Sequence, residues 1–194
     1  MFRHQGKSRT FKHNLPLASL LSFIAGLVNI TGVLLLKVLT TNVTGHFAFF
    51  AEELVRKNYW LAFNFLMFIC CFLLGSFTAS LITEFFLRKN SKSAHKYSMS
   101  IEIIILFIIG LCGNYFLKKG INYSFIADLL LFSMGIQNSL VTQISNSTVR
   151  TTHLTGLFTD LGIELSQLIF YNEDGNRKKL KKSIELRFSI ILFF

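Results

Sequence analysis

Residues 15–36 read LPLASLLSFIAGLVNITGVLLL, a run of 22 residues without a charged side chain. An α-helix of that length rises about 33 Å, which is enough to cross a hydrocarbon core of about 30 Å. The run is too long for the core of a signal peptide, and no cleavage pattern of small residues follows it. We therefore expect a membrane span that is retained in the mature protein.

The composition of the whole chain points the same way. The chain has 194 residues, of which 52% are apolar and only 15% are charged. An average soluble domain has about 25% charged residues. This composition excludes a soluble enzyme, a disordered tail and a small disulfide scaffold, and it predicts an all-α, polytopic helical membrane protein.

Three more runs are long and apolar enough to span. Among their polar residues are two carboxylates near span ends and two amides deep in the last run. Ionisable residues in a membrane are functional candidates by default, although the two carboxylates are close enough to the span ends to be solvated instead. Two further stretches are short and of ambiguous topology. The runs are residues 59–87, 98–117 and 123–144. The two carboxylates are Glu102 and Asp128, and the two amides are Gln137 and Asn138. The ambiguous stretches are residues 38–57 and 151–171.

The basic residues cluster between the apolar runs and give a net charge of +10. They fall in an N-terminal arm at 1–14, a loop at 88–97 and a loop at 172–183, as the positive-inside rule expects. We predict a multi-pass membrane protein with the N-terminus cytoplasmic. No basic domain with interleaved aromatic residues is present, so we expect no nucleic-acid binding.

Two parts of the chain resemble each other. Residues 40–54 (TTNVTGHFAFFAEEL) and 151–165 (TTHLTGLFTDLGIEL) are identical at seven of fifteen positions. Before them, FIAGLVN at 23–29 aligns with FSMGIQN at 132–138. Each half thus has F-x-x-G-x-x-N on a span and T-T-x-x-T-G at the next helix, so we predict an internal duplication. We expect a single transmembrane domain over residues 1–194, with a first repeat at 15–87, an intervening span at 98–117 and a second repeat at 123–194.

The final apolar run, 184–194, would rise only about 16 Å as a helix, half of a bilayer. We therefore expect the second repeat to be incomplete and the chain to be truncated.

The repeated motifs suggest a polar site. Asn29 and Asn138 need polar partners in hydrocarbon and should face the protein interior. Glycine allows close approach of a backbone or a ligand, and a helix opening at Thr41 or Thr152 would offer hydroxyls and free N–H groups. The alternative is that these residues only cap and pack helices.

These motifs also resemble a known family, the bacterial YoaK-like or DUF1275 family of integral membrane proteins of unknown function. The residues that carry the resemblance are Gly26–Asn29, Val43–His46, Gly135–Asn138 and Val149–Gly156. It covers residues 15 to about 190. It implies an integral membrane protein of the bacterial cytoplasmic membrane, without an established substrate. Two positions depart from the family pattern, since Asn29 stands where Asp is usual and His46 where Asn is usual.

Two topologies remain open. If both ambiguous helices re-enter, the halves are inverted repeats and the 88–97 loop is cytoplasmic. If both cross, the halves run parallel and that loop is outside. The 88–97 loop has four basic residues, and the loops expected on the opposite side of the membrane, near residues 56–57 and 118–119, also have four. The positive-inside rule therefore does not decide between the two topologies. Inverted repeats would aim two helix N-termini at the midplane and favour an anionic or strongly polar solute. A cysteine placed at Ser93 would distinguish the two.

Other chemistry is disfavoured. His153 and Asp160 are two helical turns apart, about 10 Å, which is too far for one metal shell even with Glu164 nearby. Cys70, Cys71 and Cys112 have no metal-ligand or redox spacing. Neither a nucleotide-binding nor a hydrolase motif occurs, so we expect no metal, no cofactor and no enzyme activity.

We predict a small secondary transporter or channel for a small polar or anionic solute. A non-catalytic membrane scaffold or partner-binding subunit is the alternative. The lipid bilayer is its expected surrounding, a homo-oligomer is compatible with the sequence, and the small-molecule substrate is unknown. The candidate substrate-binding residues are Asn29, Thr44, Gly45, Gln137, Asn138, Thr152, Thr155 and Gly156.

Overall fold

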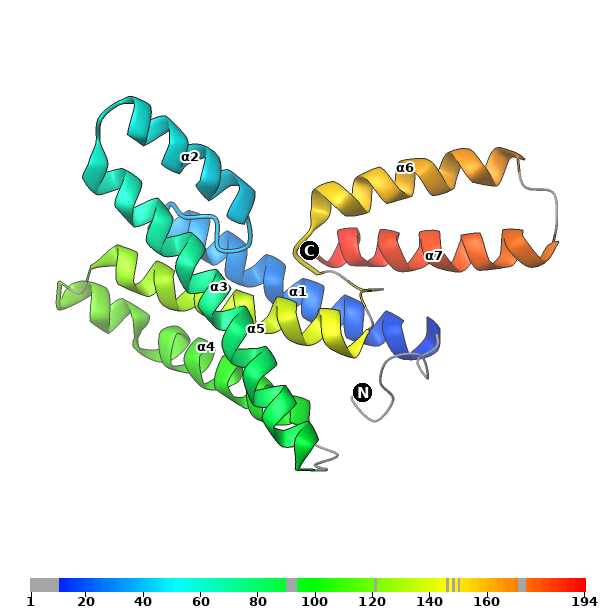
Figure 1. Ribbon diagram of the computed structural model, residues 1–194, viewed down its shortest axis with the longest axis horizontal. Helices are drawn as coiled ribbons and strands as arrows, with labels where there is room; N and C mark the ends of the chain where they lie inside the picture. Colours follow the sequence, from blue (N-terminus) through cyan, green and yellow to red (C-terminus); the bar gives the residue numbers. More distant parts are fainter. Residues whose placement is uncertain are drawn as a thin grey trace. The chain divides into compact units, whose positions relative to one another are not determined.

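The computed structural model describes residues 11–89, 94–120, 122–145, 147, 149, 151–170 and 174–194. In these ranges the chain forms seven α-helices (Figure 1). They are α1 (Phe11–Leu36), α2 (Val43–Val55), α3 (Tyr59–Arg88), α4 (Ala94–Lys118), α5 (Tyr123–Ile144), α6 (Leu154–Phe170) and α7 (Asp174–Phe193).

Four helices are candidate membrane spans by length and hydropathy. They are the whole of α1, α3 and α5, and α4 over Ala94–Gly113. The prediction of four long apolar helices is confirmed, and these helices imply contact with a lipid bilayer. Helices α2 and α6, with 13 and 17 residues, are shorter than the candidate spans.

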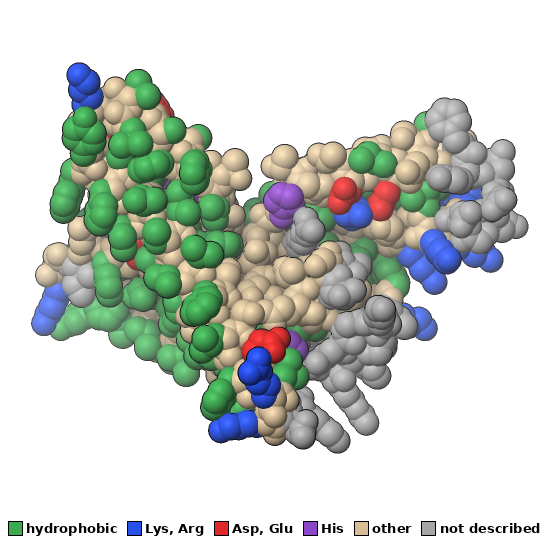
Figure 2. Space-filling model, in the orientation of Figure 1, with side chains coloured by type: hydrophobic (Ala, Val, Ile, Leu, Met, Phe, Trp, Pro, Cys, Tyr) green, Lys and Arg blue, Asp and Glu red, His purple; other side chains and the backbone are tan. Residues whose placement is uncertain are grey.

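The side chains of the spans are sorted by face, as a lipid environment requires. On α1, large apolar residues are exposed at intervals of three and four positions, from Leu20 through Phe23 and Leu27 to Leu34. The opposite face is buried. Apolar side chains also cover the visible face of α3 (Figure 2). Such contiguous apolar surface marks contact with another apolar phase.

The helices extend into all three segments that the sequence predicts to be non-helical, which are the N-terminal arm and the two basic loops. Helix α1 already begins at Phe11, inside the predicted arm, and α3 and α4 reach Arg88 and Ala94, inside the predicted 88–97 loop. Ser93 lies outside the described residues. The prediction of a loop at 172–183 is wrong, because α7 starts at Asp174 and runs through the basic residues into the apolar run. Lysine and arginine are good helix formers, so clustered charge does not stop a helix.

The chain divides into two compact units. The central unit is Leu27–Leu140, and the terminal unit combines Met1–Gly26 with Val141–Phe194. We describe each by itself.

In the central unit, α3 and α5 cross with their backbones in direct contact. A Cβ added to Gly135 would overlap the backbone of Phe72, and one added to Gly75 would overlap the backbone of Phe132. Ser76 Oγ donates a hydrogen bond to the Gly135 carbonyl, with 3.0 Å between the oxygens. The expectation that Gly135 allows close backbone approach is therefore confirmed.

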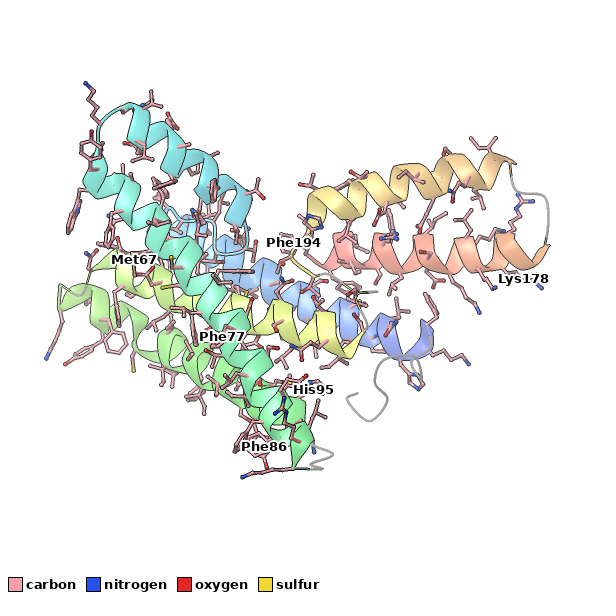
Figure 3. All side chains as sticks on the ribbon, viewed as in Figure 1. Met67, Phe77, Phe86, His95, Lys178 and Phe194 are labelled. Carbon is pink, nitrogen blue, oxygen red and sulfur yellow. The ribbon has the colours of Figure 1, made fainter. Side chains whose placement is uncertain are left out.

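In the terminal unit, Gly26, the glycine in the first copy of F-x-x-G-x-x-N, also lies in close contact with another part of the backbone. A Cβ on Gly26 of α1 would overlap the backbone of Phe194, beside the end of α7 (Figure 3). One and a half to two turns earlier, the hydroxyls of Ser19 and Ser189 are 2.9 Å apart. Helices α1 and α7 therefore run side by side in the same direction.

Replacing Gly135 with alanine should destabilise the central unit by about 1–3 kcal/mol, because the added methyl group forces two backbones apart. The matched control is Gly110→Ala on α4, where a Cβ meets no atom. Thermal unfolding in detergent measures both. Equal melting temperatures for the two variants would contradict this packing.

Candidate functional site

The break between α1 and α2 is built by a specific helix ending. Lys37 adopts a left-handed conformation with φ of 60°, and the Val38 N–H donates to the Gly32 carbonyl over 3.2 Å. A left-handed residue directly after the last helical residue is a common helix ending. The chain then passes through residues 37–42 and enters α2 at Val43.

The prediction that the repeated helices open at Thr41 and Thr152 is wrong by two residues. Helix α2 starts at Val43 because the Asn42 side chain caps it, accepting a hydrogen bond from the Gly45 N–H at 2.9 Å. Asn and Asp are stronger N-caps than Thr. Helix α6 starts at the matching position, Leu154.

The glycines of the two T-T-x-x-T-G motifs serve these helix starts. A Cβ on Gly45 would crowd the Asn42 amide, and a Cβ on Gly156 would overlap the His153 ring. Each glycine therefore makes room for the side chain three residues before it. This geometry favours the capping interpretation for Gly45 and Gly156.

The two motifs also bury the same positions. Thr40 and Thr151, the first threonine of each motif, are both 0% exposed. Thr44 and Thr155, the later threonine of each, are exposed. The local structure of the two motifs therefore repeats, and the threonines that face the protein interior are Thr40 and Thr151.

Both buried hydroxyls lack a hydrogen-bond partner within the described residues. They are Thr40 Oγ1 in the central unit and Thr151 Oγ1 in the terminal unit. A buried polar group left unpaired costs about 1–3 kcal/mol, so two such groups at matching positions require an explanation. A polar solute that reaches the helix breaks would supply the missing partner.

His46 fixes the same break from α2. Its Nε2–H donates to the Leu39 carbonyl over 2.6 Å, and its ring packs on Phe65 and Phe68 with centroid distances of 6.0 and 5.2 Å. The ring is 2% exposed. Burial lowers the pKa of His46 below its ordinary value of 6.5, although the bond to Leu39 opposes this shift. The side chain is therefore neutral at pH 7.

The predicted site residues divide between the units. Gln137 is fully buried, and Asn29 and Asn138 are half-buried. Asn29 Oδ1 is buried without a partner among the described residues. The central unit holds Asn29, Thr44, Gly45, Gln137 and Asn138; the terminal unit holds Thr152, Thr155 and Gly156.

The terminal unit contains a cavity of about 300 Å³ between α6 and α7, lined in part by His153, Gly156 and Asp160. Beside it, Arg187 of α7 binds two carboxylates of α6: Nη1 lies 2.7 Å from Asp160 Oδ2, and Nε lies 2.9 Å from Glu164 Oε2. Figure 2 shows acidic and basic side chains meeting between these helices. Both carboxylates are engaged by Arg187, and no group of three metal-ligating side chains occurs among the described residues.

With this geometry established, comparisons with known proteins place the chain. A family model described as "Protein of unknown function (DUF1275)" matches residues 17–194. The chain belongs to the DUF1275 family. It is 26% identical over 178 residues to UPF0700 transmembrane protein YoaK of Bacillus subtilis (strain 168), covering 91% of this chain and 78% of that protein. No solved structure matches.

In this DUF1275 chain, sequence reasoning missed several buried polar residues. His95 was assigned to a loop, so its place on the same face of α4 as Ser98 and Glu102 was not visible. The spacing of small residues on α3, Gly75-x-x-x-Ala79-x-x-x-Thr83, was the available signal for a packing face. Thr40 and Thr151 belong to the repeated motif, but the sequence pattern favours the later threonines Thr44, Thr152 and Thr155 as candidate site residues.

Acidification should destabilise the central unit through His46. Because its pKa is lower in the folded state, unfolding takes up a proton, and stability falls as pH drops below about 6.5. The variant His46→Asn should reduce this pH dependence, while His153→Asn, at an exposed position, should keep it. Melting temperatures of the purified proteins at several pH values measure the effect. An unchanged slope in His46→Asn would contradict it.

Proposed function

We propose that this chain is a non-catalytic membrane transporter or channel for a small polar solute, which it contacts at the two helix breaks. The observation that carries the proposal is the pair of buried hydroxyls at Thr40 and Thr151, neither of which has a hydrogen-bond partner in the part of the chain that the structure describes. Transporters often bind solutes where membrane helices are broken, because unwound backbone and free polar groups gather there.

Capping narrows the class of solute. An anion would be attracted to free N–H groups at a helix start. At α2, Asn42 already takes up the Gly45 N–H. This favours a polar solute bound by hydroxyl and amide groups over an anion bound by the helix start.

We further propose that the two halves are inverted repeats. In the central unit, Gly75 meets Phe132 and Cys71 shares a hydrogen bond with Asp128. From Cys71 to Gly75 along α3, the contacting residues on α5 move from Asp128 to Phe132. These contacts show that α3 and α5 run in the same direction.

The end of α1 gives the direction of the first span. Leu36 packs against a cluster of Phe68, Ala127 and Leu131, close to the start of α5 and in the first third of α3. Helices α1 and α5 both have to cross the same hydrocarbon core. If the end of α1 lies level with the start of α5, the two spans cross in opposite directions, as inverted repeats do.

Helix α2 fits this arrangement as a helix that does not cross. Its 13 residues rise about 20 Å, and it packs beside the first third of α3 through His46 and Phe49. The paired contacts also support the repeat. Gly135 of the second half meets α3 of the first half, and Gly26 of the first half meets the last residue after α7 of the second half.

The variants Thr40→Val and Thr151→Val should reduce solute flux without loss of stability. Valine keeps the shape of threonine, and removing an unpaired buried hydroxyl is neutral or stabilising. Flux is measured by osmotic swelling of proteoliposomes in urea, glycerol, glycine and lactate. The last two probes test zwitterions and anions.

The matched controls are Thr44→Val and Thr155→Val, which make the same change at exposed positions of the same motifs. They should keep wild-type flux. If both buried variants also keep it, the threonines have only a packing role. If wild-type vesicles pass no probe faster than protein-free vesicles, the scaffold alternative is favoured.

The topology is tested with single cysteines at two exposed positions in a background without Cys70, Cys71 and Cys112. With a cytoplasmic N-terminus, inverted repeats put Lys57→Cys outside and Lys89→Cys inside. An impermeant maleimide should then label only Lys57→Cys in intact cells, and both variants after lysis. The opposite labelling would establish parallel repeats.

A further inference from the structure

Helix α4 has one buried polar face. His95, Ser98 and Glu102 lie at spacings of three and four residues, which places them on one side of the helix. All three are buried, whereas Ile103, Ile104 and other apolar residues of the span are exposed. This helix turns its apolar side chains outward and its only carboxylate inward. Such an intramembrane carboxylate is a candidate functional group.

The position of Glu102 follows from the neighbouring contacts. Ser98 Oγ donates to the Ala79 carbonyl of α3 over 3.2 Å. Helices α3 and α4 form an antiparallel hairpin, so Glu102, one turn after Ser98, lies at the level of Gly75, one turn before Ala79. Gly75 is also where the α5 backbone at Phe132 approaches α3. Glu102 therefore lies at the level at which α5 approaches α3.

Among the described residues, no cation pairs with this carboxylate. Glu102 is 4% exposed and forms no ion pair with any residue that the structure describes. An ionised carboxylate buried without a partner is expensive, and such a group takes up a proton instead.

The other titratable groups on these helices leave Glu102 without a charged partner. Asp128 of α5 is hydrogen-bonded to Cys71 of α3. His95 lies two turns from Glu102 on α4, at the end of the hairpin that meets α3 (Figure 3). Glu84 of α3 is exposed. The bases lie at or beyond the helix ends, at Arg88, Lys89, Lys96 and Lys118.

Other buried polar atoms lie on the same three helices as Glu102. Thr83 Oγ1 on α3, Ser133 Oγ on α5 and His95 Nδ1 on α4 are buried and have no hydrogen-bond partner in the described part of the chain. Thr83 lies one turn beyond Ala79, toward the end of the hairpin that carries His95.

We propose that Glu102 is a proton-binding site, and that it couples proton movement to solute movement. The coupling rests on the proposed transport function, whereas the proton binding does not. The carboxylate takes a proton from water on one side of the membrane and releases it to water on the other. Only an O–H bond forms and breaks, so the step needs no further reactant.

The first experiment measures protonation directly by infrared spectroscopy of the purified protein. Near pH 7, the wild type should show the carbonyl stretch of a protonated carboxyl group, and labelling glutamate with ¹³C should shift it. Glu102→Gln should lose this band, and Glu84→Gln, the same change at an exposed position of α3, should keep it. A band that persists in Glu102→Gln, or is absent from the wild type, would overturn the proposal. If Glu102→Gln does not fold, the band that shifts on ¹³C labelling of glutamate decides instead. It should be present in the wild type and absent from Glu102→Asp.

The second experiment measures proton entry into proteoliposomes that contain a pH-sensitive dye, with an imposed pH gradient and the solute that gives flux. Wild type and Glu84→Gln should acidify the lumen, and Glu102→Gln should fall to the level of protein-free vesicles. Solute flux without proton entry in the wild type would overturn the coupling and leave the transport function intact. Proton binding without flux of any solute would refute the transport function instead.

Discussion

Every feature of this protein depends on the absence of water from the hydrocarbon core. Backbone groups there must bond within helices, and polar side chains must turn toward other helices. Four helices therefore expose leucine, isoleucine and phenylalanine and bury small or polar residues. Because lipid gives no hydrophobic reason for helices to associate, close backbone contact has to hold them together. Gly75 and Gly135 provide that contact between α3 and α5.

The same constraint gives meaning to the exceptions. A helix break is costly in a membrane unless its polar groups are paired or line a polar space. The break after α1 pairs most of its groups: Val38 bonds Gly32, His46 bonds Leu39, and Asn42 caps α2. The hydroxyl of Thr40 has no hydrogen-bond partner within the described ranges, and neither has that of Thr151 at the matching position.

The two halves use this common framework with different chemistry. In the first half, α2 packs on α3 through the rings of His46, Phe49, Phe65 and Phe68. In the second half, α6 and α7 are joined by Arg187, Asp160 and Glu164 beside a polar cavity. Neither set of residues is identical between the halves, although the helix starts and buried threonines correspond.

The sequence alone determined the class of this protein, because hydropathy and helix length are local properties. The four long helices, the family and the role of Gly135 in close packing were all predicted from runs and motifs. The helix limits were less predictable: the bases at 177–182 read as a loop, although they extend α7. Tertiary structure alone showed that Thr40 and Thr151, rather than Thr44 and Thr155, are buried, and that the face of α4 with His95 and Glu102 is buried. Burial depends on which helices lie opposite, and a sequence pattern gives the face of a helix without naming its neighbour.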